Sequence, residues 1–393
     1  MEFAYICSEC ARRFVIEPGL MVCPHCSRDQ APDQPLCGVL EVELLGAAPT
    51  DWTTASLLPV EPRFFPPIPV GNTPLWAPER LRQELESPGL HIKDDGLNPT
   101  CSLKDRASFL VSAFAAKFAI EEIVLASTGN AGSSMAGVGA AAGQKVTLFL
   151  PKAVPKAKLI QALQYGARVF RVGGSYDDAY DLSLAYTAKF GGMSRNTAYN
   201  PMTIEGKKTV SLEIFRQLGR VPDALFVSVG DGCILSGVYK GFRDIRRLGL
   251  SDRLPVVYAV QADGSDALAR AVEEGVFRRK ASNTVADSIS VDVPRNGHHA
   301  LRQLQEHGGR VVRVSDTQIL AAQARLSRSA GLFTEPAGAA AFAGFLNVRH
   351  QLPEPAVTVV LATGNGLKDT AAAGRSVEIP EQVITRLEEV EGR

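Results

Sequence analysis

The sequence lacks an excess of charge of either sign, and it lacks long hydrophobic runs. Its 393 residues carry 42 Lys and Arg against 42 Asp and Glu, so the net charge is zero. This balance excludes proteins that hold nucleic acid or an anionic membrane through overall positive charge. The most apolar stretch, GNAGSSMAGVGAAAG, is mainly Gly, Ala and Ser, and MEFAYICSEC has no basic segment followed by an apolar core. We therefore expect no membrane span, no secretion signal and a cytoplasmic location.

Two nucleotide-binding fingerprints are also lacking. No G-x-x-x-x-G-K-[ST] occurs, and the glycines of SVGDGCILSG, at Gly230, Gly232 and Gly237, do not have the G-x-G-x-x-G spacing. In SVGDGCILSG the glycines nevertheless lie between an apolar run typical of a strand and a pattern typical of a helix. Backbone N–H groups at such a turn can bind phosphate, although many turns of this kind only connect a strand to a helix.

Cysteine is present in seven copies, and four of them form a pattern. Cys7, Cys10, Cys23 and Cys26 make two C-x-x-C pairs separated by twelve residues. Two knuckles at this distance favour a structural Zn2+ ion in a zinc ribbon; two redox disulfides or unbound thiols are the alternatives. Four thiolates fill a tetrahedral shell, so a catalytic zinc is not expected.

The order of apolar runs predicts an α/β protein with mostly parallel sheets. A chain this long exceeds what one hydrophobic core holds, so we expect two main units. Residues 31–78 are rich in proline and predict an extended connection with an edge strand. The predicted strands that follow, each beside a helical pattern, are EEIVLAS, KVTLFLP, ARVFRVGG, DALFVSVG, PVVYAVQA, GRVVRVS and AVTVVLAT.

A lysine and three turns stand in an informative order. Lys104 lies in NPTCSLKDRAS and is followed along the chain by LASTGNAGSS, SVGDGCILSG and LATGNGLKD. Turns after parallel strands meet at the edge of a sheet where ligands bind. A lysine there is either an ordinary solvated charge or a buried amine used as a nucleophile. In this order of motifs, from about residue 70 to 370, the chain resembles threonine synthases, which are fold type II pyridoxal-phosphate enzymes of threonine biosynthesis.

The resemblance assigns roles to particular residues. It implies that Lys104 is the Schiff-base lysine of pyridoxal 5′-phosphate, that Asn130 faces the 3′ oxygen of the ring, and that Thr363 faces the ring nitrogen. A hydroxyl there, rather than a carboxylate, favours elimination and replacement over transamination. The cofactor phosphate is expected on the backbone of Gly230, Asp231, Gly232, Cys233 and Ile234. Substrate contacts are expected from Ser127, Thr128, Lys207 and Lys208.

The expected organisation has three parts. Residues 1–35 form the zinc ribbon, residues 36–110 and 204–393 form a large cofactor-binding unit, and residues 111–203 form a small unit that hinges over it. The resemblance also implies a homodimer, with a small amino acid as its substrate. No nucleic-acid partner is expected, since the ribbon has only Arg12 and Arg13 as clustered basic residues.

The sequence departs from the family at two anion-binding positions. Thr203 stands where the family has an arginine, and Ala131 stands where it has a threonine. Loss of an arginine fork weakens phosphate binding unless another cation replaces it. The candidate cations are Lys156, Lys158, Arg195, Lys207 and Lys208.

We expect conversion of O-phosphohomoserine and water to threonine and phosphate. One alternative is β-elimination or β-replacement on serine, threonine or another activated amino acid, which Thr203 and Ala131 favour. An alternative of another class is a cofactor-free binding protein built on the zinc ribbon. A Glu335 in FTEPAGAAAF is expected near the cofactor or as a helix cap.

Overall fold

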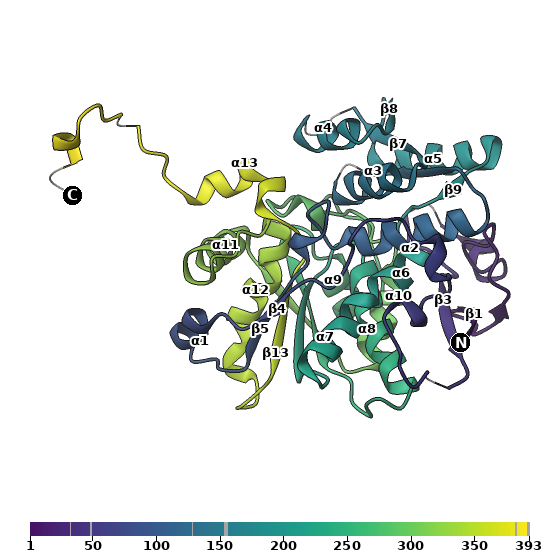
Figure 1. The fold of residues 1–393 in the computed structure, drawn as a ribbon, viewed down its shortest axis with the longest axis horizontal. Coiled ribbons are helices and arrows are strands. Elements are labelled where there is room, and N and C mark those ends of the chain that lie inside the picture. Colours follow the sequence, from purple (N-terminus) through teal and green to yellow (C-terminus); the bar gives the residue numbers. More distant parts are fainter. Residues whose placement is uncertain (32, 48, 128, 153–155, 382, 391–393) are drawn as a thin grey trace.

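The computed structural model describes residues 1–393 except 32, 48, 128, 153–155, 382 and 391–393, and except the side chains of 29, 156–158 and 388. Three sheets organise the chain. Figure 1 shows a smaller α/β unit above a larger one, with the N-terminal strands beside α2. No helix in the described part has the length and apolar character needed to cross a bilayer.

The N-terminal sheet is antiparallel, with the order β2-β1-β3. β3 pairs with β1 along its whole length, from Glu2↔Leu45 to Cys7↔Leu40. This pairing adds a segment beyond residue 35 to the sheet of the N-terminal strands. β3 is an edge strand within residues 31–78, for which an edge strand was predicted, and its Leu40, Val42 and Leu44 are buried. The strands are β1 (Glu2–Cys7), β2 (Arg13–Phe14) and β3 (Leu40–Leu45).

The smaller α/β unit has a parallel four-stranded sheet in the order β8-β7-β6-β9. Its helices cover the sheet, and α2 and α3 share one hydrophobic core with Tyr5 and Leu40 of the N-terminal sheet. All four strands fall within the predicted range 111–203. The elements are α2 (Lys104–Lys117), β6 (Glu122–Ala126), α3 (Asn130–Ala142), β7 (Lys145–Pro151), α4 (Lys156–Gln164), β8 (Arg168–Val172), α5 (Tyr176–Phe190) and β9 (Met193–Ser194).

The larger unit has a six-stranded sheet in the order β12-β11-β10-β13-β5-β4, parallel except for the edge strand β4. β10 and β13 are buried at every residue, as expected for strands covered on both faces. Its strands are β4 (Leu75–Trp76), β5 (Leu90–Asp94), β10 (Ala224–Ser228), β11 (Val256–Ala262), β12 (Arg310–Val314) and β13 (Thr358–Ala362).

Helices on both faces of this sheet complete the larger unit (Figure 1). They are α1 (Glu79–Leu85), α6 (Met202–Lys207), α7 (Thr209–Leu218), α8 (Cys233–Arg247), α9 (Ala267–Glu274), α10 (Gly297–Glu306), α11 (Asp316–Ala330), α12 (Pro336–Val348) and α13 (Thr370–Ala373). Short 3-10 helices include η5 (Asp287–Ile289) and η7 (Gly366–Lys368). The predicted α/β class with two parallel sheets is confirmed.

The turns at the carboxyl ends of β6 and β10 approach one another. Ala126 and Ser127, at the end of β6, line a cavity that also contains Lys104. Ser228 and Val229, at the end of β10, line a small adjoining cavity that contains Lys104 as well. The fold thus brings sheet edges from both units to one lysine, which is the arrangement that open parallel sheets favour for ligand binding.

Candidate active site

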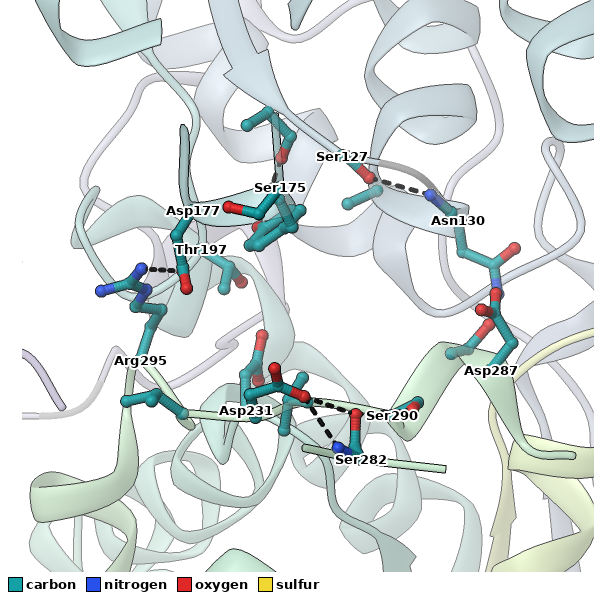
Figure 2. Close-up of a pocket in the computed structure, with 18 of the residues that line it drawn as sticks. Ser127, Asn130, Ser175, Asp177, Thr197, Asp231, Ser282, Asp287, Ser290 and Arg295 are labelled. Atoms are coloured by element: carbon teal, nitrogen blue, oxygen red, sulfur yellow. Dashed lines mark hydrogen bonds and ion pairs between the residues drawn. The ribbon is translucent and has the colours of Figure 1, made fainter. Parts of the chain in front are cut away.

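The cavity between the two units has a volume of about 320 Å³. Figure 2 shows Ser127 and Asn130 of the smaller unit on one wall and Asp231, Ser282 and Ser290 of the larger unit on the opposite wall. A space of this size, lined by both apolar and polar groups, suits a cofactor together with a small substrate.

Lys104 is the first residue of α2. It is half-buried and lines both the larger and the small cavity. The preceding turn is held in place because Leu103 donates its N–H to the carbonyl of Thr363 at 2.9 Å. The Asp105 carboxylate accepts the N–H of Thr100 at 2.7 Å. The NPTCSLKD stretch therefore presents the amine of Lys104 from a fixed helix start.

The electrostatic surroundings of Lys104 favour its neutral form. Burial lowers the pKa of Lys104, and the cations of Lys207 and Arg195 lower it further, while Asp231 opposes the shift. A neutral amine can act as nucleophile and as proton acceptor, whereas an ammonium cannot.

The glycine loop after β10 has the form of a phosphate cradle. Gly232 has φ +85°, and a Cβ on Gly230 would lie 2.8 Å from the Cα of Ile289, so both positions require glycine. α8 begins at Cys233, whose N–H is bound by the Asp231 carboxylate, while the cap residue Gly232 has no side chain. Open N–H groups and the positive helix end suit a phosphate.

Charge around this loop is balanced by buried side chains. Burial alone would raise the pKa of Asp231, but Lys104 and Lys207 hold it below its ordinary value. The Asp231 carboxylate accepts the N–H of Cys233 at 2.8 Å. Cys233 is fully buried and its Sγ lies 2.8 Å from the Nζ of Lys207, whereas Ile234 lines the small cavity.

Asn130 opens α3 and is buried on the opposite wall. Its amide nitrogen donates to both carboxylate oxygens of Glu335, at 2.8 and 3.0 Å, which connects the two units. Its Oδ1 is buried and has no hydrogen-bond partner among the described residues. A buried acceptor without a partner fits a site whose ligand supplies a donor. Glu335 occupies the cap position of α12 but makes no side-chain cap bond there.

The residues present fit pyridoxal phosphate. The glycine loop offers a phosphate cradle, Lys104 offers an amine beside it, and Asn130 offers an unpartnered carbonyl oxygen. The carbonyl of Thr363 accepts a hydrogen bond from Leu103, the residue before Lys104. The side chain of Thr363 is buried and is not among those that line the larger cavity.

The predicted substrate-binding residues fall in different places. Ser127 lines the cavity, and its hydroxyl accepts the N–H of Gly132 at 2.9 Å. Lys207 is buried beneath the glycine loop, with its Nζ 3.3 Å from the Thr197 hydroxyl. Thr128 and the side chains of Lys156 and Lys158 lie outside the described residues.

Lys208 does not line the cavity. Its ammonium is buried, donates to the carbonyl of Leu57 at 2.7 Å and to Asp244 at 2.9 Å, and pairs with Glu205. These partners neutralise its charge, so we leave Lys208 out of the proposed substrate contacts. Glu205 belongs to the same buried network.

The two departures from the family pattern differ in position. Thr203 is completely buried and does not line the cavity, and its hydroxyl donates to the carbonyl of Asn200 at 2.7 Å. Ala131 lines the cavity, as does Arg195.

Several cavity residues were not singled out from the sequence. They come from the start of α5 and from the segment between α9 and α10, where SNTVADSISVDVPRN is polar and without periodicity. A polar loop of that length is itself a signal for a binding segment. The missed residues are Tyr176, Asp177, Arg279, Ser288 and Arg295.

The four N-terminal cysteines lie together. The Sγ atoms of Cys7, Cys10, Cys23 and Cys26 are all within 4.8 Å of one another. Cys7 and Cys26 are 3.8 Å apart, and so are Cys10 and Cys23. A tetrahedral ion with metal–sulfur distances of about 2.3 Å places its sulfurs about 3.8 Å apart, so the cluster has the dimensions of a four-thiolate zinc site.

Comparison with known proteins places the chain in a family. Residues 68–364 match the model described as pyridoxal-phosphate dependent enzyme. A threonine synthase of Methanosarcina acetivorans is 33% identical over 98% of this chain and 96% of its own length. A threonine synthase of Methanocaldococcus jannaschii is 36% identical over 80% of this chain and 79% of its own.

Solved structures share the fold at lower identity. Maize serine racemase covers 78% of this chain and 91% of its own, with TM-score 0.68 and 20% identity. A threonine deaminase of Solanum lycopersicum covers 85% of this chain and 96% of its own, with TM-score 0.69 and 22% identity. The family match sets aside the alternative of a cofactor-free binding protein. The chain is a pyridoxal-phosphate dependent lyase and belongs to the threonine synthase family.

Proposed function

We propose that this protein converts O-phosphohomoserine and water to threonine and phosphate. The observation that carries the proposal is that Lys104 lines the larger cavity together with the buried Asn130 and also lines the small cavity at the glycine loop. The lowered pKa of Lys104 supports its use as a base. Similarity to threonine synthases along most of the chain supports the choice of substrate.

The cofactor would be held by backbone and side chains already in position. The loop from Gly230 to Ile234 would take the phosphate, Asn130 and Thr363 would contact the ring, and Lys104 would bond to the cofactor carbonyl. Pyridoxal phosphate, when bound, supplies an electron sink for the charge that develops at the Cα atom of the substrate.

Proton transfer is assigned to Lys104. Once the substrate amine has replaced it, its amine takes the proton from Cα and then moves protons at Cβ and Cγ. The bond from Cγ to oxygen breaks, and phosphate leaves with the bonding electrons. Water adds its hydroxyl at Cβ, and protons return to Cα and Cγ, which completes threonine. One amine can serve in each step because it stays close to all three carbons.

The small unit, proposed as residues 111–203, would close over the cavity and exclude water. It carries Ser127 and Asn130, while the phosphate cradle belongs to the larger unit. We further propose a structural zinc ion on Cys7, Cys10, Cys23 and Cys26, a cytoplasmic location, and a homodimer, which light scattering on the purified protein would test.

The test is release of phosphate and threonine from O-phosphohomoserine by the holoenzyme. Equal amounts of both products are expected from the wild type and none from Lys104→Ala. Lys117→Ala, at the other end of α2, is the matched control and should retain turnover. Visible absorbance of the bound cofactor without turnover would contradict phosphohomoserine as substrate.

A second candidate is elimination on serine or threonine, which Thr203 and Ala131 favour. It predicts a 2-oxo acid and ammonia in place of phosphate and threonine. Assay of both product pairs on the same preparation separates the two reactions.

A further inference from the structure

Arg195 directly follows β9, at the edge of the smaller sheet. Its backbone N–H donates to the carbonyl of Val124 in β6 at 2.8 Å, which fixes its main chain. Its side chain is 1% exposed and lines the cavity that contains Lys104.

Among the described residues no carboxylate forms an ion pair with Arg195, although Asp231 and Asp105 act on its charge from a greater distance. Its Nε donates to the Ser108 hydroxyl at 3.3 Å, and its Nη2 is buried without a hydrogen-bond partner. Other arginines of this region are paired: Arg279 binds Asp33 at 2.9 Å, and Arg295 binds Asp177. A buried guanidinium without an anion at hydrogen-bond distance is costly, so an arginine with an unpartnered Nη2 at a cavity wall has a place for an anionic ligand.

The other anion positions of the site have their own donors. The glycine loop and the start of α8 are the proposed place of the cofactor phosphate. The first turn of α3, where Ser127 accepts the N–H of Gly132, has the positive helix end that suits a carboxylate. Thr203 cannot supply the missing cation, because its hydroxyl is short, neutral and bound to Asn200.

We propose that Arg195 binds the phosphate group of the substrate and so replaces the arginine that the family carries at position 203. The inference rests on the proposed function, because it takes the substrate to be phosphorylated. The planar guanidinium can donate two parallel hydrogen bonds to a phosphate, which gives orientation as well as charge.

The first experiment measures binding of inorganic phosphate to the holoenzyme by calorimetry, without turnover. Arg195→Met should weaken binding at least about tenfold, and Arg195→Lys, which keeps charge but not the fork, should fall between. Arg328→Gln is the matched control, because this arginine is exposed in the last turn of α11 and does not line the cavity. Its phosphate affinity should stay within about twofold.

A second ligand separates phosphate from carboxylate recognition. L-2-aminobutyrate has the amino and carboxylate groups of the substrate but no phosphate. The concentration of L-2-aminobutyrate that gives half of the change in the visible absorbance of the holoenzyme should be similar in wild type and Arg195→Met. If the variant loses affinity for aminobutyrate and keeps that for phosphate, Arg195 belongs to the carboxylate and the proposal is overturned.

Thermal unfolding separates a binding role from a structural one. Without phosphate, Arg195→Met should have a Tm equal to or above that of the wild type, because it removes a buried charge that makes no direct ion pair. A lower Tm with unchanged phosphate affinity, or a wild type that binds no phosphate, would overturn the proposal. Phosphate binding that depends on Arg195 in an enzyme that does not turn over O-phosphohomoserine would instead contradict only the proposed function.

Discussion

Arg295 of the larger unit donates a hydrogen bond to Asp177 of the smaller unit within the lining of the active-site cavity (Figure 2). Arg279 lies 3.7 Å from the same carboxylate and also pairs with Asp33, which follows the cysteine cluster. Charged side chains thus connect all three parts of the chain beside the substrate position.

We expect the ion pair between Arg295 and Asp177 to help hold the two units closed over the cavity. Asp177→Asn should lower kcat/KM about fivefold, because a half-exposed pair contributes about 1 kcal/mol. The loss should grow smaller as salt concentration rises, since salt screens the wild-type pair. Asp181→Asn, at an exposed position on the same helix, is the control and should change kcat/KM little. An unchanged rate in Asp177→Asn would mean that the pair is dispensable for closure.

The lowered pKa of Lys104 predicts how the cofactor-free enzyme takes up pyridoxal phosphate. Only the neutral amine reacts, so the rate of colour formation should rise with pH to a midpoint below the 10.5 of an ordinary lysine. Asp231→Asn removes a carboxylate that raises this pKa and should move the midpoint lower still. Stopped-flow absorbance against pH measures both midpoints. A midpoint at or above 10.5 would contradict the burial argument.

The pKa of Glu213 predicts how the stability of the fold changes at low pH. Burial would raise its pKa, but Arg106 and Lys93 lower it to about 2 from an ordinary 4.5. Because the folded pKa is the lower one, the stabilisation is complete above pH 4.5 and is lost as the pH falls toward 2. A shift of this size corresponds to about 3 kcal/mol.

Urea unfolding at several pH values tests this prediction. Glu213→Gln should be less stable than wild type near neutral pH, and the difference should shrink on acidification. Glu121→Gln, at an exposed position, is the control. A difference that does not depend on pH would show that lost packing, and not charge, causes the effect.

The cysteine cluster predicts one metal ion per chain. Elemental analysis of purified protein should find zinc, and Cys10→Ser should lose it, because three thiolates bind far more weakly than four. Since the N-terminal sheet shares a hydrophobic core with α2, the loss should also lower the Tm. Cys37→Ser, outside the cluster, should keep the metal. Protein without metal but with the wild-type Tm would contradict a structural zinc.

The sequence by itself determined the features that depend on neighbouring residues. Alternating apolar runs predicted both parallel sheets, and the order of Lys104, the STGN turn, the glycine loop and ATGNGLKD predicted the family. The spacing of the four cysteines predicted their cluster. Each of these is local, because a turn, a helix start or a metal knuckle is specified by a few adjacent residues.

Only the tertiary structure decided which cations face the cavity. Lys207 and Lys208 are adjacent in sequence, yet one lies beneath the glycine loop and the other is neutralised in a buried network. Arg195 lines the cavity, whereas Thr203 does not line it and donates its hydroxyl to Asn200. The segment for which composition predicted an extended connection with an edge strand supplies β3, and only the structure shows that β3 pairs with the N-terminal strand β1. These outcomes depend on packing between segments far apart in the chain, and the local periodicity of a sequence does not encode such packing.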